Sequence, residues 1–366
     1  MQLPVVFWLV FAFVLGTGVG SFLNVLVARL PLEKSIIWPS SRCFVCFNPI
    51  GLGDNLPIIG YLRLRGKCRK CGAGFSSRYL WVEVFTGLAF VGLFVLEILM
   101  NWHNIPAFVG VREQMLHGIP SPAAIGFWAV HAMLLSALVA SALIDAKYRI
   151  IPAQITYPMT LVGILCSTLL PWPWPAIDPA QLPNLPTDRS WILPEVWLRI
   201  PTGLTLWPFW GPLPEWAPMG SWKLGLMNGL VGAAAGMAIG RGIKNLFELG
   251  FGKEALGLGD ADLLMMSGAF LGWQPIALAL FVGALLSIVI VVPQRIWELI
   301  RGRPAGEPLP FGPGLAAGVV VCWLGWPWLS QLVQPFFFDL VLLLVMVTII
   351  GGGLLAAGLM LRRKAK

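Results

Sequence analysis

Charged residues are scarce in this sequence: Asp, Glu, Lys and Arg make up 11% of its 366 residues, whereas 57% are hydrophobic. Because an average soluble domain is about 25% charged, this composition excludes a soluble protein. Eight stretches are nearly free of charge, and most approach the roughly 20 apolar residues that cross a bilayer. They are residues 4–28, 80–100, 123–144, 155–171, 224–240, 261–292, 313–333 and 336–361. With 261–292 broken into two helices near Gly272 to Pro275, the sequence predicts an all-α polytopic membrane protein of eight or nine transmembrane helices.

Acidic residues are also few, 17 against 25 Lys and Arg, and the net charge of +8 could indicate nucleic-acid binding. The basic residues, however, fall in alternate loops. Residues 28–80, 145–154, 241–260, 293–312 and those after 361 hold 21 of them, and the other loops hold 4. This positive-inside pattern predicts that the basic loops are cytoplasmic, that the N-terminus is outside and that there is no nucleic-acid partner. Because no basic residue precedes Arg29, we expect the first span to be a retained anchor instead of a cleaved signal peptide.

Two stretches interrupt the apolar pattern. Residues 31–79 accumulate Cys, Gly, Pro, Arg and Lys, and the charge distribution places them in the cytoplasm. Residues 172–222 are rich in Pro and Trp, which predicts an external insertion without a long helix. We therefore expect four parts: a transmembrane helix in 1–30, a cytoplasmic module in 31–79, a membrane core in 80–333 that includes the insertion, and an extra helix with a basic tail in 334–366.

Cysteines cluster in the cytoplasmic module. Cys43-x2-Cys46 and Cys68-x2-Cys71 are two pairs with 21 residues between them. Each x2 turn brings two thiolates to one ion, so the four cysteines predict a tetrahedral Zn²⁺ site. Disulfides are the alternative, but a reducing cytoplasm disfavours them. Because four thiolates leave no open coordination position and the module has little apolar core, we expect the zinc to be structural.

Carboxylates are rare in the spans, so the two that stand at span ends are functional candidates. Asp145 ends the third span and Asp260 begins the sixth, and the alternation of spans puts both on the cytoplasmic side. Two carboxylates that share a proton can deliver a water to a peptide carbonyl, one as base and one as acid, because repulsion separates their pKa values. This is aspartic-protease chemistry, and it makes Asp145 and Asp260 the candidate catalytic pair.

Gly257 and Gly259 precede the second of these carboxylates in a Gly-Leu-Gly-Asp string. They would let an unwound backbone approach another segment closely, which suits a site that receives an extended peptide. The alternative for each candidate Asp is an ordinary solvated residue at a helix end. Asp262 is a rival carboxylate that could instead pair with Lys147 or Arg149.

Four blocks of the sequence, in order, resemble the type IV prepilin leader peptidases, the Gly-x-Gly-Asp aspartic proteases of bacterial membranes. The blocks are Gly20 to Val25 with Arg29-Leu30-Pro31, Ser41 to Glu83 with its four cysteines, Ile144-Asp145 with Ile151-Pro152, and Gly257 to Asp260 with Gly268 to Gly272 and Leu309 to Pro313. The resemblance covers almost the whole chain. Two positions depart from the family pattern: Asp262 stands where Lys is common, and Ala153 stands where an Asp often follows Ile-Pro.

This resemblance implies a function in the bacterial inner membrane. Asp145 and Asp260 would be the catalytic pair, and the substrate would be a prepilin or pseudopilin whose short basic leader is cut on the cytoplasmic side. A second activity often accompanies cleavage, namely methylation of the new N-terminal residue with S-adenosylmethionine, and in the family it is connected with the cysteine-containing region.

Two other functions stay open at this point. One is a proton-coupled transporter with a regulatory zinc module, and the other is a relative that binds prepilins as an assembly factor without cutting them. A transporter predicts polar residues within the spans, and these spans are almost free of them. The sequence therefore favours the peptidase.

Overall fold

The computed structural model describes residues 3–103, 105, 108–170, 215–218, 220–252, 257–301, 310–329, 332–333 and 340–364. It divides into two compact units: unit 1 is 1–102 with 108–144, and unit 2 is 103–107 with 145–366. Over the described ranges the regular structure is helical, with two isolated β-bridges. Long apolar helices with the length and hydropathy of membrane spans are Leu3–Leu32, Arg78–Leu99, Pro122–Tyr148 and Trp222–Gly250, and shorter apolar helices accompany them. The predicted all-α multi-pass architecture is confirmed.

Unit 1 is built on the helix pair α1 (Leu3–Arg29) and α3 (Arg78–Phe94), and α3 continues as the π-helical turn η3 (Val95–Leu99). The two helices approach closely because glycines face the partner. A Cβ added at Gly16 would lie 2.8 Å from the carbonyl oxygen of Thr86, and one at Gly20 would lie 2.8 Å from the Cα of Glu83. Small residues spaced four apart are the usual means of tight helix packing in membranes.

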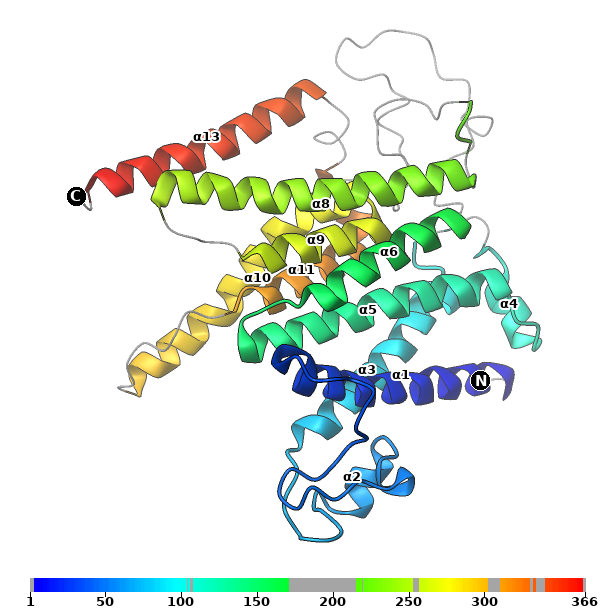
Figure 1. Cartoon of the computed structure of the whole chain (residues 1–366). Helices are drawn as coiled ribbons and strands as arrows, with labels where there is room; N and C mark the ends of the chain where they lie inside the picture. Colours follow the sequence, from blue (N-terminus) through cyan, green and yellow to red (C-terminus); the bar gives the residue numbers. More distant parts are fainter. Residues whose placement is uncertain are drawn as a thin grey trace. The chain divides into compact units, whose positions relative to one another are not determined.

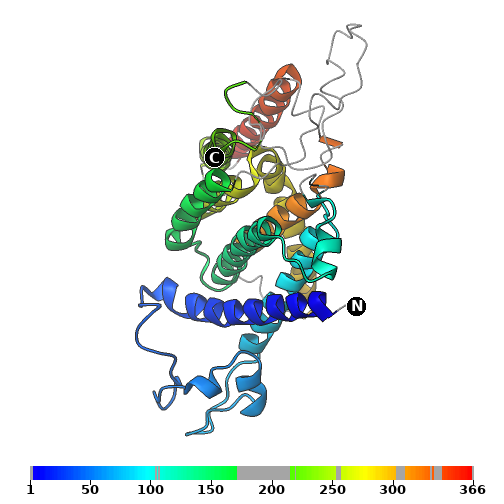
Figure 2. The same cartoon turned by 90° about the vertical axis from the view of Figure 1, so that its right-hand side faces the viewer.

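The segment between α1 and α3 forms a small module with little regular structure. It contains the short helices η1 (Leu30–Leu32), η2 (Leu52–Asp54) and α2 (Ile59–Arg63), and it extends from the ends of α1 and α3 (Figures 1 and 2). Unit 1 is completed by α4 (Val111–Leu116) and by most of α5 (Pro122–Tyr148).

The core of unit 1 is aromatic, and it also buries one polar pair. Trp128 of α5 packs edge-on against Phe90 and Phe94 of α3, and its indole N–H donates to the carbonyl of Phe90 over 3.1 Å. Nearby in the sequence, Nδ1 of His131 lies 2.6 Å from Oε1 of Glu97, which sits in the π-helical turn. Both side chains are at most 2% exposed. A buried pair of this kind is uncommon within membrane helices, and the contact joins one carboxyl oxygen of Glu97 to the imidazole ring.

Unit 2 packs its helices around α9 (Leu258–Leu271), which is buried along most of its length. The helices in contact with it are α6 (Ala153–Leu169), α8 (Trp222–Phe251), α10 (Trp273–Ile300) and α11 (Gly312–Leu324). Figure 1 shows α8 and α9 side by side. Their approach is so close that a Cβ at Gly232 would lie 2.0 Å from the carbonyl oxygen of Gly268. Helix α13 (Leu340–Lys364) lies against α8.

The predicted break in 261–292 is present. Helix α9 ends at Leu271, Gly272 takes a φ of +80°, and α10 begins at Trp273. Helix α8 runs past the predicted end at residue 240, and Lys244 and Glu248 form an i,i+4 ion pair within this polar end. The Pro- and Trp-rich insertion at 172–222 lies almost wholly outside the described residues, as do several residues before α13.

Candidate active site and metal site

The four cysteines of the module lie in two similar turns. In the first, Cys43 accepts a backbone hydrogen bond from Phe47, and its own N–H donates to Asn48. In the second, Cys68 makes the equivalent bonds with Gly72 and with Ala73. One isolated β-bridge lies beside each turn. This repeated geometry directs the thiol groups of both turns toward one point.

The sulfur positions fit a tetrahedral metal site. Sγ of Cys43 lies 3.6 Å from that of Cys71, and Sγ of Cys46 lies 3.8 Å from that of Cys68. All four sulfurs lie within 4.8 Å of one another, and none is disulfide-bonded. Thiolates about 2.3 Å from a tetrahedral Zn²⁺ are about 3.8 Å apart, so the sulfurs have the spacing that such an ion requires. The residues of this cluster can hold a metal.

The protonation of the cluster is uneven. Backbone N–H groups of Cys46 and Val45 lower the pKa of Cys43 to about 6, which favours its thiolate. A hydrogen bond from Ala73 lowers the pKa of Cys71, but burial and the neighbouring sulfurs outweigh it and raise this pKa to about 11. Since metal ligation requires thiolates, a bound cation would offset the repulsion that raises the pKa of Cys71.

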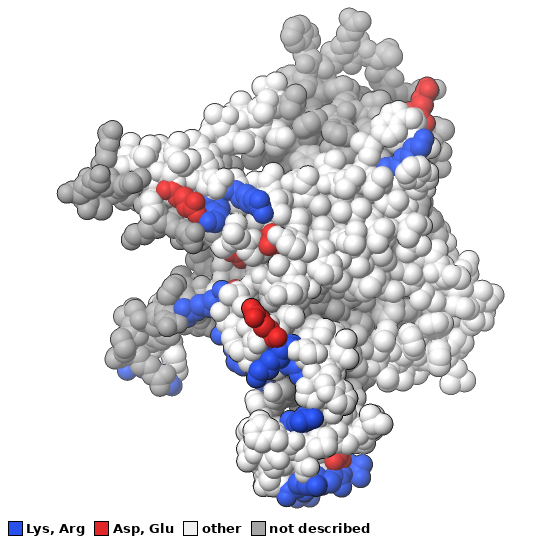
Figure 3. Space-filling model, viewed as in Figure 1, with Lys and Arg blue, Asp and Glu red and all other residues white. Residues whose placement is uncertain are grey.

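The module also carries much of the basic charge of unit 1. Figure 3 shows Lys and Arg side chains gathered around the segment that contains α2. Among the few acidic partners, Asp54 accepts two hydrogen bonds from Arg69, at 2.7 and 2.5 Å. These bonds hold the pKa of Asp54 below its ordinary value, so this carboxylate stays ionised.

In unit 2, Asp145 is held at the end of α5 by a contact with a distant segment. The backbone N–H of Gly312, the first residue of α11, donates to Oδ2 of Asp145 over 2.8 Å. A Cβ at Gly312 would lie only 2.6 Å from the same oxygen. The absence of a side chain at this position therefore lets the carboxylate reach the backbone. Asp145 is only 7% exposed.

Asp260 is held in a similar way at the start of α9. Its Oδ2 accepts the backbone N–H of Gly257 over 3.0 Å, and the residue is 8% exposed. The charge of Asp145 is one of the influences on the Asp260 carboxyl. The structure thus brings together two carboxylates that are 115 residues apart in the sequence, within one unit.

The glycines before Asp260 act differently from one another. Gly257 caps α9 in an extended conformation, whereas Gly259 is already helical, so the backbone there is not unwound as expected. Gly259 nevertheless allows a close approach, because a Cβ would lie 2.8 Å from the Cβ of Ile151. The Ile-Pro segment after α5 therefore packs directly against the first turn of α9.

Asp262, the rival carboxylate, is also buried, at 7% exposure, and Arg241 of α8 is the cation that acts on it. Arg149, which the sequence offered as its partner, instead acts on Asp145. The position of Gly312 beside Asp145 could not be inferred from charge or periodicity. The buried pair of Glu97 and His131 was likewise not predicted, because neither residue belongs to a recognisable motif.

Known proteins are similar in sequence to this chain over most of its length. Residues 14–96 match the model of the Bacterial Peptidase A24 N-terminal domain, and residues 197–292 match that of the Type IV leader peptidase family. A prepilin leader peptidase/N-methyltransferase of Myxococcus xanthus is 30% identical over 311 residues, which cover 82% of this chain and 70% of the relative. Proteins of the same name from Stutzerimonas stutzeri (28%; 89% and 92% covered) and Pseudomonas aeruginosa (27%; 88% and 91%) are also similar. No solved structure matches.

Proposed function

This chain belongs to the type IV leader peptidase family, and from that premise we propose that Asp145 and Asp260 form the catalytic pair of a membrane aspartic endopeptidase. Its substrates are prepilins or pseudopilins, from which it removes the short basic leader. The observation that supports the assignment of residues is the pairing itself: two buried carboxylates lie in unit 2, each bonded to a backbone N–H, and the charge of Asp145 acts on Asp260. Family membership also favours the peptidase over the transporter.

The mechanism follows from one shared proton. Two neighbouring carboxylates cannot both stay ionised at low cost, so the pair holds one proton and one negative charge near neutral pH. The ionised member removes a proton from a water, which attacks the scissile carbonyl carbon, while the protonated member donates to the carbonyl oxygen. Collapse of the tetrahedral species breaks the C–N bond, and the amine leaves with a proton from the pair. Water and peptide bond are consumed, and one carboxylate and one amine are produced.

The positions of the pair at helix ends suit a substrate with an apolar helix and a basic leader. The apolar helix can lie among the spans, while the leader stays in water. The distribution of Lys and Arg supports a cytoplasmic active site and an external N-terminus in the bacterial inner membrane. The four-cysteine cluster supports a structural Zn²⁺, which would stabilise a module that has few apolar contacts of its own.

A second activity belongs to the same proposal. The relatives are named N-methyltransferases as well as peptidases, and we assign this chain methylation of the amine that cleavage releases. The methyl group comes from S-adenosylmethionine: a C–S bond breaks, an N–C bond forms, the donor becomes a neutral thioether and the amine loses a proton to solvent.

The experiment that tests the catalytic pair is cleavage of a prepilin by the purified protein in detergent. Asp145→Asn and Asp260→Asn keep the shape but remove the exchangeable proton, and each should lower kcat at least about 10³-fold. The matched control is Asp262→Asn, a buried carboxylate on the same helix as Asp260 that should leave cleavage nearly unchanged. Wild-type cleavage that persists in either of the first two variants, or that is lost equally in the control, would contradict the assignment.

A further inference from the structure

The part of the cysteine module that contains η2 and α2 carries an apolar cluster on its surface, made up of Leu52, Leu56, Ile59 and Leu62. Leu52 is 92% exposed, and Ile59 and Leu62 are each 60% exposed. Ile59 and Leu62 stand three residues apart in α2, so they lie on the same side of that helix. Because the removal of apolar surface from water is favourable, a group of exposed apolar side chains marks a surface that a partner covers.

The apolar cluster is held by a packed turn of backbone. Gly60 of α2 is buried against η2, where an added Cβ would collide with the carbonyl oxygen of Asp54. The backbone N–H of Gly60 also donates to the carbonyl of Leu56 over 2.8 Å, and that of Leu62 donates to the carbonyl of Ile58 over 3.0 Å. The helices η2 and α2 are therefore one folded piece, which presents the apolar side chains in fixed positions.

This piece lies beside the apolar part of α1, not beyond its basic end. The backbone N–H of Ile58 donates to Oε2 of Glu83 over 2.7 Å, and the Cα of Glu83 lies against Gly20 of α1. Gly20 precedes Arg29, the first charged residue of the sequence, by nine residues. At the rise of an α-helix this separation is about 13 Å along the helix axis. The segment therefore reaches back from the end of α1 to the level of its uncharged, membrane-spanning part.

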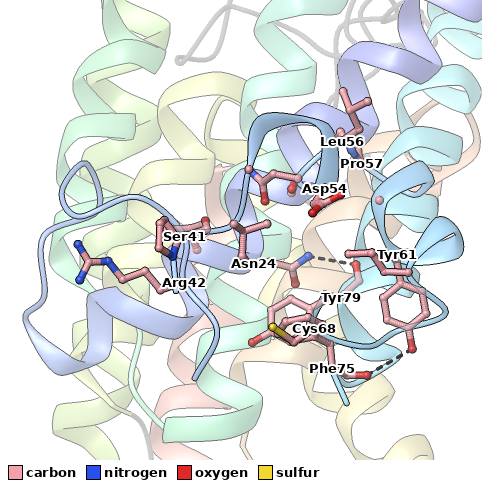
Figure 4. A pocket seen from close by; sticks show the side chains of 18 of the residues that line it. Asn24, Ser41, Arg42, Asp54, Leu56, Pro57, Tyr61, Cys68, Phe75 and Tyr79 are labelled. Carbon is pink, nitrogen blue, oxygen red and sulfur yellow. Dashed lines mark hydrogen bonds between the residues drawn. The ribbon is translucent and has the colours of Figure 1, made fainter. Parts of the chain in front are cut away.

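The same segment borders a cavity of about 980 Å³ between the module and the helices α1 and α3. Figure 4 shows residues of the segment and of both helices around it, among them Asp54, Leu56, Pro57, Tyr61, Asn24 and Tyr79. Non-helical backbone at the level of a membrane span needs protein or water around its polar groups. The cavity provides both on the inner side of the segment, so the outer apolar cluster can face lipid.

A basic cluster adjoins the apolar one and consists of three exposed residues at and after the end of α2, namely Arg63, Arg65 and Lys67. A Cβ at Gly53 would lie 3.9 Å from Nη1 of Arg63, so this guanidinium lies beside η2. Within residues 51–70 of the sequence the one acidic residue is Asp54, and two hydrogen bonds from Arg69 pair it. The surface next to the apolar cluster is therefore positively charged.

We propose that the η2–α2 segment is an anchor in the lipid–water interface that binds anionic phospholipid. The apolar cluster enters the boundary of the acyl chains, and the basic cluster contacts the phosphates of the headgroups. An apolar surface bordered by cations matches both layers of such an interface, whereas a basic prepilin leader is repelled by it. The proposal does not depend on the catalytic pair, whose residues belong to unit 2.

The first test identifies what covers the apolar cluster. The full chain carries p-benzoylphenylalanine in place of Leu62 and is reconstituted with a prepilin in vesicles of equal phosphatidylglycerol and phosphatidylcholine. Light should link this position to lipid, with a phosphatidylglycerol-to-phosphatidylcholine product ratio at least about fivefold above that at Phe7. Phe7, which is exposed on α1 without a neighbouring cation, is the matched control for lipid contact. Main products with the prepilin or with a second copy of the chain, or no lipid product where Phe7 gives one, would overturn the proposal.

The second test isolates the role of the basic cluster at the same photoreactive position. The double variant Arg63→Gln with Arg65→Gln should lower the lipid product ratio at Leu62 to that at Phe7. The control is Arg42→Gln with Lys70→Gln, which removes two exposed cations from the same module outside the basic cluster and should keep the ratio. A ratio that is unchanged in the first variant, or that falls equally in the control, would overturn the assignment of the phosphates to Arg63 and Arg65.

Discussion

Gly312→Ala tests whether the backbone contact to Asp145 positions the proposed catalytic pair. The added Cβ would lie 2.6 Å from Oδ2, 2.9 Å from Cγ and 3.0 Å from Cβ of Asp145, so the aspartate must move. The φ of Gly312 is not in the left-handed region, and the residue begins a helix, so alanine is tolerated by the backbone itself. The substitution therefore acts through the carboxylate.

The size of the effect follows from the bond that is lost. A hydrogen bond to a charged group contributes about 1.5–3 kcal/mol, which corresponds to about a 10- to 150-fold loss of rate if the bond is needed in the transition state. Misplacement of a catalytic group by about 1 Å has a cost of similar size, near 10²-fold. We expect kcat for prepilin cleavage to fall within this range and KM to change little, because the aspartate acts on the reacting atoms.

The assay is steady-state cleavage of a purified prepilin by the full chain in detergent, with thermal unfolding measured on the same samples. Gly242→Ala on α8 is the control, since a Cβ there meets nothing within 4 Å, and it should cleave like the wild type. Wild-type kcat in Gly312→Ala would refute the reasoning, because Asp145 would then be positioned by something other than this contact. A loss of thermal stability equal to the loss of activity would assign the effect to folding.

Two further predictions concern unit 1. The wild type should carry about one zinc ion per chain by elemental analysis, and Cys68→Ser should abolish this content, whereas Cys166→Ser, which lies outside the cluster, should keep it. Zinc retained by Cys68→Ser would refute the four-thiolate site. His131→Ala removes the hydrogen-bond partner of the buried Glu97 side chain and should destabilise the protein by about 1–3 kcal/mol; a thermal unfolding midpoint equal to that of the wild type would show that this pair does not contribute to stability.

The sequence predicted those features whose cause is local. The break at Gly272 follows from a glycine with positive φ, and the proximity of Cys43 to Cys46 follows from the x2 turn. Scarcity of charge predicted the membrane helices, and the position of Asp260 at the start of an apolar stretch marked it as a candidate. Each of these inferences needs only neighbouring residues or composition.

Features that depend on distant contacts were not predictable in this way. The bond from Gly312 to Asp145 joins residues 167 apart. The bond from the N–H of Ile58 to Glu83 joins residues 25 apart. A glycine in the sequence does not show whether it permits a turn, a helix contact or an approach to a carboxylate, because these depend on which segment packs against it. Only the packed structure shows that Gly312 permits the approach of a carboxylate.

Both proposed catalytic carboxylates are held by the same kind of contact, a backbone N–H at the start of a helix. The first N–H groups of a helix have no partner within it, and the helix dipole adds positive potential there. Asp260 takes the N–H at the start of α9, and Asp145 takes the N–H at the start of α11. Each N–H favours the ionised form of its carboxylate, while proximity of the two disfavours double ionisation. Opposed effects of this kind favour one proton on the pair, as the proposed exchange of acid and base roles requires.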